Sequence, residues 1–297
     1  MTKLKKIIFG GKWYTAYRSF NSDTVFNICY SPANEYCADP FLISDNNKTY
    51  IFCEQYRMDR RKGCIGYYEF VDGVPVNKGI IIERPYHMSY PCVFKYNDEY
   101  YMIPETGENK TVEVYKADEF PYKWTLYKVL LSGKAYVDTT VIISNNCPVM
   151  VTYCSDQDGY SLEKYEISKD FSSVRLTCKK RYPENTGRGA GAFFTRSDGS
   201  LIRPSQNCRS AYGENVIFNK VTELHNNYDE VPIGMLTIND VKFDKIIRRK
   251  NIMGLHTYTF NNNYEVIDIF VRQFSLTYTI GNLMAKKKRI KHIMGER

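Results

Sequence analysis

The chain alternates between short apolar runs and tight polar turns over most of its length, and segments with the 3.6-residue period of a helix are scarce. Residues 36–56, "YCADPFLISDNNKTYIFCEQY", give the pattern in its clearest form, with a turn of Asp, Asn and Asn between two apolar runs. Two apolar runs joined by such a turn predict a β-hairpin.

The same hairpin pattern recurs along the chain. Copies begin at residues 38, 89, 137 and 189, and a looser copy, "GLHTYTFNNNYEVIDIF", begins at residue 254. In the first four copies, a residue that opens the first run lies 15 positions before one that closes the second: Asp39 and Glu54, Tyr90 and Glu105, Asp138 and Tyr153, Ala190 and Ser205. We therefore infer an internal repeat of roughly fifty residues.

A Tyr-rich pair of less apolar strands follows each hairpin, which gives four strands for each repeat. Four antiparallel strands every ~50 residues is the spacing of propeller blades. The sequence predicts an all-β fold, a single five-bladed β-propeller of four-stranded blades over residues 1–285, in which "KWYTAYRSF" (12–20) completes the last blade. Residues 286–297 form a basic C-terminal tail, and this tail is the best candidate for a helix.

Nine cysteines are scattered singly and lack the spacing of a metal site, so we expect buried, reduced thiols and neither a metal nor a cofactor. The N-terminal apolar stretch, Ile7 to Phe9, is too short for the core of a signal peptide, and no run approaches the ~20 residues of a membrane span. These features predict a cytoplasmic location.

The net charge is +8, and the tail contributes to it with a run of basic residues: Lys286, Lys287, Lys288, Arg289 and Lys291. Such a run is either a solvated tail or a site of attraction to anionic lipid, which would place the protein at the periphery of the inner membrane. Nucleic acid is not an expected partner, because no nucleic-acid-binding motif accompanies the charge.

The propeller prediction gives the acidic residues a common location. The inner strand of each blade lines the central channel, so Asp39, Glu54, Glu105 and Asp138 are expected around one mouth of it, and Asp268 of the looser fifth copy is a further candidate there. Crowded carboxylates split their pKa values, and this can keep one acid protonated beside an ionised one, as glycosyl chemistry requires. The alternative is structural: Asp39 and Asp138 could simply cap turns.

The same mouth is expected to carry groups that bind substrate. Arginines can grip phosphate or carboxylate bidentately, and tyrosines can stack on sugar rings. The candidates are Arg57, Arg61, Arg188, Arg203, His256, Tyr90 and Tyr153. A solvated loop for residues 57–62, a charge partner of the acids for Arg188 and a structural histidine for His256 are the alternatives.

The runs "ADPFLI", "SYPCVFKYNDEYYMIPETG", "DTTVI" and "GRGAGAFF" resemble a propeller family over roughly residues 30–270. That family occurs at the N-terminus of plant glucosamine inositolphosphorylceramide transferases and in bacterial proteins encoded with surface-polysaccharide genes. More distantly, the blades are similar to five-bladed glycoside hydrolases. That similarity implies a base or nucleophile at Asp39 and an acid at Glu105 or Glu54, whereas the later blade that usually supplies a third acid has Ser205 and Gln206 here.

Three functions follow from these observations. The first is a cytoplasmic glycosyltransferase of capsule or O-antigen synthesis, which would use a nucleotide sugar as co-substrate and a lipid-linked glycan as acceptor. In it, Asp39 or Glu105 would deprotonate the acceptor and the arginines would hold the donor diphosphate. The second is a glycoside hydrolase, and the third is a propeller that binds glycans without chemistry.

Overall fold

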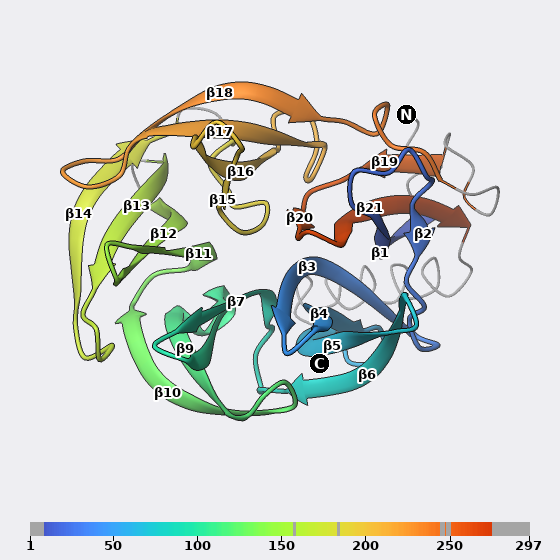
Figure 1. The fold of residues 1–297 in the computed structure, drawn as a ribbon, viewed down its shortest axis with the longest axis horizontal. Coiled ribbons are helices and arrows are strands. Elements are labelled where there is room, and N and C mark those ends of the chain that lie inside the picture. The colour runs from blue at the N-terminus through green and yellow to red at the C-terminus, as the bar shows by residue number, and fades with distance from the viewer. Residues whose placement is uncertain (1–8, 157–158, 183–184, 244–246, 248–250, 275–297) are drawn as a thin grey trace, which may run out of the picture.

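The computed structural model describes residues 9–156, 159–182, 185–243, 247 and 251–274. Its strands form five antiparallel sheets arranged radially around a central axis, with the inner strands β3, β7, β11, β15 and β20 nearest that axis (Figure 1). The five-bladed propeller predicted from the sequence is confirmed.

Blades 1 to 3 each contain four strands in simple chain order from the axis outwards. In blade 1 these are β3 (Glu35–Asp45), β4 (Lys48–Arg57), β5 (Lys62–Val71) and β6 (Val74–Ile82). In blade 2 they are β7 (Ser89–Tyr96), β8 (Glu99–Thr106), β9 (Thr111–Glu119) and β10 (Lys123–Ser132). In blade 3 they are β11 (Tyr136–Ser144), β12 (Cys147–Asp156), β13 (Gly159–Ile167) and β14 (Val174–Arg181).

Blade 4 has a short inner strand and three longer ones: β15 (Phe194–Thr195), β16 (Leu201–Asn207), β17 (Asn215–Glu223) and β18 (Asp229–Leu236). Blade 5 joins the two ends of the chain, with β20 (Tyr258–Phe260), β21 (Tyr264–Phe274), β1 (Phe9–Ser19), β2 (Asn27–Ile28) and a small extra strand, β19 (Ile252–Gly254), beside β21.

The propeller ring is closed by hydrogen bonds between the first and last long strands. β1 pairs with β21 in continuous antiparallel register, from Phe9 opposite Phe274 to Ser19 opposite Tyr264. The prediction that residues 12–20 complete the last blade is confirmed. Both strands also pack against β3, which places blade 5 beside blade 1.

The hairpins of blades 1 to 3 share a bulge that the sequence did not reveal. In each hairpin the register shifts at an equivalent point. The last pair before the shift is Ala38 opposite Glu54 in blade 1, Ser89 opposite Glu105 in blade 2 and Val137 opposite Tyr153 in blade 3. The next residues, Asp39, Tyr90 and Asp138, have φ angles of 50°, 45° and 50°. Glu54 therefore pairs with Ala38 and not with Asp39, and three non-glycine residues adopt a strained backbone at the same place in three blades.

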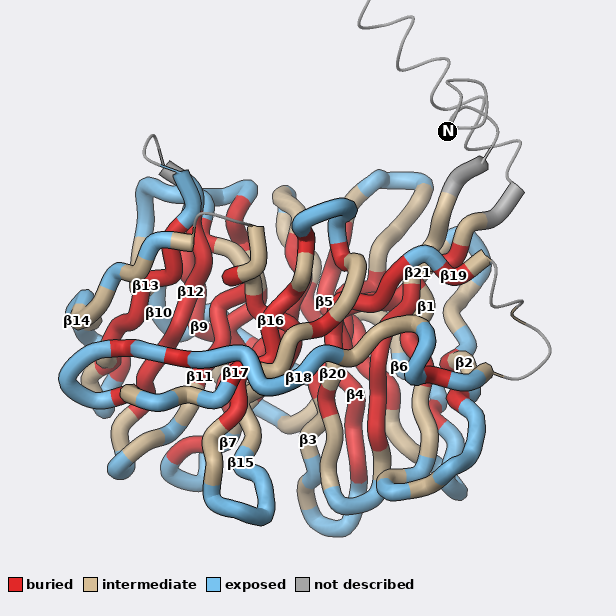
Figure 2. The backbone as a smooth tube through the Cα atoms, turned by 90° about the horizontal axis from the view of Figure 1, so that it is seen from above, coloured by how far each residue is buried: buried red, intermediate tan, exposed pale blue. Residues whose placement is uncertain are grey.

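Buried residues occupy the middle of the strands, and exposed residues lie mainly at the turns and outer edges (Figure 2). The nine cysteines are free thiols, most of them buried, as predicted. Among the described residues, the helical element is one 3₁₀ turn, Gly107–Asn109. No helix in these ranges is long and apolar enough to cross a bilayer. The basic tail, 286–297, and residues 275–285 lie outside the described residues.

Candidate functional site

The mouth of the channel is the end at which the inner strands begin. Five acidic residues from four blades meet there, and we call them the carboxyl cluster: Asp39, Glu54, Glu105, Asp138 and Asp268. Their charges act on one another across the blades, which requires them to share one region. The four predicted acids are thus brought together, and Asp268 of β21, the further candidate from the fifth copy, lies with them.

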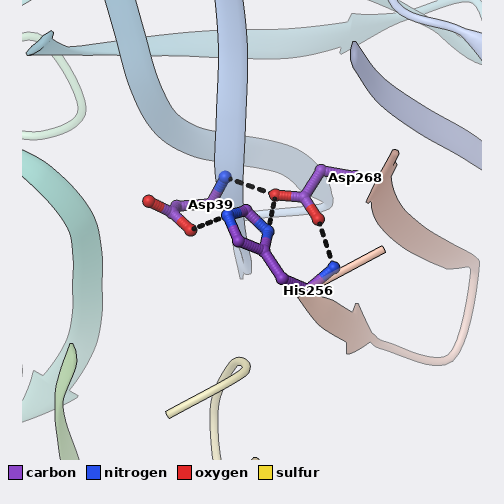
Figure 3. A group of neighbouring side chains, drawn as sticks. All are labelled: Asp39, His256 and Asp268. Atoms are coloured by element: carbon purple, nitrogen blue, oxygen red, sulfur yellow. Dashed lines mark hydrogen bonds and ion pairs between the residues drawn. The ribbon is translucent and has the colours of Figure 1, made fainter. Parts of the chain in front are cut away.

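Asp39 of blade 1 and His256 and Asp268 of blade 5 form a buried triad (Figure 3). One oxygen of Asp268 accepts the backbone N–H groups of His256 and Thr257, at 3.1 and 2.9 Å. The other accepts the N–H of Asp39 at 2.8 Å and lies 2.7 Å from Nδ1 of His256. Asp268 therefore fixes the imidazole and the bulged backbone of Asp39 at once.

His256 stands between two carboxylates and against an aromatic ring. Its Nε2 lies 3.5 Å from Oδ1 of Asp39, and its ring is stacked on Trp13 with centroids 3.7 Å apart. Burial disfavours the charged imidazolium, but the carboxylates of Asp268 and Asp39 outweigh burial and raise the pKa of His256. The triad is thus arranged to hold an imidazolium between two acids.

The triad has the residue types of a metal site. One potential ligand atom from each of Asp39, His256 and Asp268 lies within 4.8 Å of the other two, and among the described residues this is the group that meets that criterion. However, both oxygens of Asp268 and both ring nitrogens of His256 already face partners inside the cluster. A cation would have to replace those contacts, so we treat the triad as a hydrogen-bonded ion-pair network.

Arg188 connects the acids of blades 2 and 3. Its Nε and Nη2 lie 2.6 and 3.2 Å from the two carboxylate oxygens of Asp138, and Nη2 lies 3.6 Å from Glu105. The backbone N–H of Asp138 donates to Glu105 at 3.2 Å, and Gln206 donates to Asp138 at 3.3 Å. Asp138 is therefore held as an ion pair, and Glu105 is the reachable neighbour, with 14% of its side chain exposed against 3% for Asp138.

Glu54 faces a neutral histidine rather than a cation. Nδ1 of His87 accepts the backbone N–H of Gly63 at 3.0 Å, which places the ring proton on Nε2, 3.5 Å from Glu54. Burial lowers the pKa of His87. A side chain at Gly63 would lie 2.5 Å from the Glu54 carboxylate, so only glycine permits this contact.

The environments separate the acids into proton donors and a proton acceptor. Burial, opposed by His256 and reinforced by Asp268 and Asp138, raises the pKa of Asp39 to about 6. Burial and the charge of Asp138, opposed by Arg188, raise the pKa of Glu105 to about 8. Burial and the charges of Asp39 and Glu105 raise the pKa of Glu54 well above its usual value. Near pH 7 the mouth thus contains a protonated Glu105 and a mainly ionised Asp39.

The two predicted tyrosines are committed to internal contacts. The hydroxyl of Tyr90 reaches across the channel to Thr140, at 2.9 Å, and to the backbone of Gly191, and the residue is fully buried. The hydroxyl of Tyr153 donates to Asn185 at 3.2 Å, and its ring packs on Tyr160. Tyr90 therefore fills the channel, and Tyr153 supports a wall of the mouth.

Arg203 does not face the mouth. It is buried, and its Nε and Nη2 bind the carboxylate of Glu230 at 2.8 and 2.6 Å. Tyr182 of blade 3 and Tyr228 of blade 4 donate to the same carboxylate. The expected substrate contact is therefore replaced by a structural ion pair where blades 3 and 4 pack.

Two of the predicted arginines lie at the rim of the mouth: Arg57 is the last residue of β4, and Arg61 lies in the turn between β4 and β5. Arg57 lies 3.2 Å from Asp59 and 3.9 Å from Glu83, and its buried Nε has no hydrogen-bond partner in the described part of the chain. Arg61 is exposed and has a φ of 54°. The rim is thus basic, but Arg57 is partly neutralised by its own neighbours.

Sequence reasoning missed two aromatic residues of the site. Trp13 lies beneath His256, and Tyr212 lies over Arg188 with its ring centre 5.2 Å from the guanidinium. Trp13 is far in sequence from His256 and the C-terminal strands of blade 5, and Tyr212 is a single aromatic in a loop. The one available signal was the predicted closure of blade 5 by residues 12–20, which brings Trp13 to this blade.

Residues 12–256 match the sequence profile of the family described as glucosamine inositolphosphorylceramide transferase 1, N-terminal. Proteins called glucosamine inositolphosphorylceramide transferase 1 are 31% identical over 217 residues in Oryza sativa subsp. indica and 32% identical over 215 residues in Arabidopsis thaliana. These matches cover 69% and 68% of this chain and 28% of each relative, so the chain spans little more than a quarter of their length.

Two solved structures share the fold at low identity. A family 117 glycoside hydrolase from Zobellia galactanivorans superposes with a TM-score of 0.55 at 14% identity, covering 91% of this chain and 92% of that one. An α-L-arabinofuranosidase from Podospora anserina superposes with a TM-score of 0.58 at 12% identity, covering 80% and 90%. At these identities the likeness concerns the fold alone.

Proposed function

The chain belongs to the family of glucosamine inositolphosphorylceramide transferase 1 N-terminal domains, and from this membership we propose that it acts on carbohydrate by glycosyl transfer at the propeller mouth. The observation that carries the proposal is the pair formed by Asp39 and Glu105. With pKa values of about 6 and about 8, the two carboxyl groups are a base and an acid at the same neutral pH.

Each residue of the pair has a role that its contacts support. Asp39 takes the proton of the attacking acceptor hydroxyl, and His256 and Thr257 on its Oδ1 hold the carboxylate in place. Glu105, whose side chain is the most exposed in the carboxyl cluster at 14%, protonates the oxygen of the leaving group. The ion pair of Arg188 with Asp138 lies beside Glu105, with Nη2 of Arg188 3.6 Å from the Glu105 carboxylate.

The basic rim supplies the contact to a phosphate-bearing substrate. Arg57 has a buried Nε donor without a partner in the described chain, and Arg61 is exposed beside it. The name of the relatives describes transfer involving glucosamine and inositolphosphorylceramide, a phosphate-containing lipid. We accordingly propose a nucleotide sugar as donor and a lipid-linked acceptor, in a protein that works at the cytoplasmic side of a membrane in surface-polysaccharide synthesis.

The test is a panel of nucleotide sugars, with release of nucleoside diphosphate as the readout in the presence of detergent-dispersed lipid acceptors. We expect release with one donor, abolished in Asp39→Asn and reduced in Glu105→Gln. The Tyr122→Ala variant, altered in the turn between β9 and β10 at the end of the propeller opposite the mouth, is the control. Release that is unaffected in both acid variants would remove the carboxyl cluster from the reaction.

A second candidate, glycoside hydrolysis, is favoured by the protonated state of Glu105, because a sugar alcohol depends on a general acid to leave even more than a nucleoside diphosphate does. Incubation with aryl glycosides and with oligosaccharides, followed by analysis of reducing ends, separates the two. Cleavage without any nucleotide sugar would select hydrolysis over transfer.

A further inference from the structure

Residues 208–214 form the loop between β16 and β17, and this loop carries Tyr212 to the carboxyl cluster. The guanidinium of Arg188, which binds Asp138, lies 5.2 Å from the centre of the Tyr212 ring. The ring also meets His256 edge-on at 5.4 Å between centroids, and His256 faces Asp39. Tyr212 therefore contacts both halves of the site, the blade 3 ion pair and the buried triad.

The loop is packed so that Tyr212 has a fixed position. Gly213 has a φ of 62°, and a side chain on it would lie 2.8 Å from the Trp13 ring and 3.0 Å from His256. Its N–H donates to the sulfur of Cys208 at 3.4 Å. Only glycine lets the loop lie flat on Trp13 and His256 in this way.

Tyr212 is exposed where its neighbours are not. Its exposed fraction is 53%, against 8% for Trp13 and 2% for His256. Aromatic rings with an exposed surface beside fixed charged groups suit sugars, since the C–H face of a sugar packs on the ring while its hydroxyls bond to the charges. Glu105 and Arg188 supply those polar partners at the same place.

We propose that Tyr212 is the stacking wall of a sugar subsite, placing one ring of the glycan against the carboxyl cluster. The inference rests on the proposed function, because it assumes that the ligand is a carbohydrate. It adds a specificity residue: the aromatic ring of Tyr212, and not its hydroxyl, holds the sugar.

The variants follow from that distinction. Tyr212→Phe keeps the ring and should bind glycan within about twofold of wild type. Tyr212→Ala removes the ring and should bind about tenfold more weakly, the loss expected for one aromatic contact of ~1.4 kcal/mol. Tyr122→Ala is the matched control: Tyr122 also has an exposed fraction of 53%, but it lies in the turn between β9 and β10, at the other end of the propeller.

Binding is measured by saturation-transfer NMR and by Trp13 fluorescence in a Trp124→Phe background, which leaves Trp13 as the only tryptophan. The probes are glucosamine, myo-inositol 1-phosphate, cellotriose and β-1,3-galactotriose. Circular dichroism and thermal unfolding establish that each variant is folded.

The outcomes separate this inference from the function on which it rests. Binding lost in Tyr212→Ala and kept in Tyr212→Phe and Tyr122→Ala supports the stacking wall. Equal binding by wild type and Tyr212→Ala contradicts the proposal that Tyr212 stacks on the sugar, and it is compatible with the carbohydrate function. Loss in both Tyr212 variants assigns the effect to the hydroxyl and also overturns stacking. A wild type that binds none of the four probes contradicts the wall together with the carbohydrate function.

Discussion

Replacing Glu105 with Gln should stabilise the protein at high pH, because this carboxyl group is buried among other acids. Its folded pKa of about 8 lies above the usual 4.5. The sign follows from linkage: a raised pKa gives stability that is present below pH 4.5 and is lost as the pH rises through about 8. The glutamine side chain has no proton to lose, so the variant escapes that loss.

The magnitude comes from the two pKa values. The interval from 4.5 to about 8, at about 1.4 kcal/mol for each pH unit, amounts to about 5 kcal/mol once ionisation is complete. Between pH 5 and pH 9, the stability of Glu105→Gln relative to wild type should therefore increase by about 4 kcal/mol. At roughly 2 °C per kcal/mol for a chain of this size, the difference in Tm should widen by about 8 °C.

The assay is thermal unfolding of both proteins at pH 5 and pH 9. The control is Glu113→Gln in the same blade. Glu113 is also buried, but hydrogen bonds from tyrosine, threonine and asparagine side chains outweigh burial and lower its pKa. Because Glu113 is ionised at both pH values, its replacement should destabilise about equally at each. A difference between wild type and Glu105→Gln that is the same at pH 5 and pH 9 would refute the reasoning.

Two further predictions concern activity and stability. Turnover should follow a bell-shaped pH profile, rising near pH 6 as Asp39 ionises and falling near pH 8 as Glu105 loses its proton. The residual turnover of Glu105→Gln should lack the alkaline limb. A flat wild-type profile between pH 5 and pH 9 would speak against this acid–base pair. Arg203→Met should lower the free energy of unfolding by about 3–5 kcal/mol in urea titrations, because Glu230 is left buried without its cation. Glycan binding should not change in folded Arg203→Met, and adding Glu230→Gln should recover part of the lost stability.

The repeat of apolar runs and turns was sufficient to predict the fold. Hairpins with a constant 15-residue offset predict equivalent blades. The remaining strand-like segment, 12–20, was therefore expected to pair with the last strand and complete its blade. Glu54 and Glu105 were placed at the mouth for the same reason: both close the second strand of their hairpins, and equivalent positions in a propeller lie at the same end of the axis.

The rest of the site depends on features without a local signature. The bulges at Asp39 and Asp138 turn these side chains toward neighbouring blades, and strand alternation does not encode them. The choice of Arg188 over Arg203 as the arginine of the mouth is decided by tertiary partners, since Arg203 meets a buried Glu230 that lies 27 positions later. Tyr212 reaches the site through the loop geometry that Gly213 allows.

The central claim is that acids from separate blades share one mouth and control each other's protonation. The most direct test is a titration of the side-chain carboxyl carbons by ¹³C NMR, in wild type and in Asp39→Asn. We predict that Glu105 titrates near pH 8 and that its pKa falls in the variant, because a neighbouring negative charge is removed. A Glu105 that titrates near 4.5, or one whose pKa is the same in both proteins, would contradict the account.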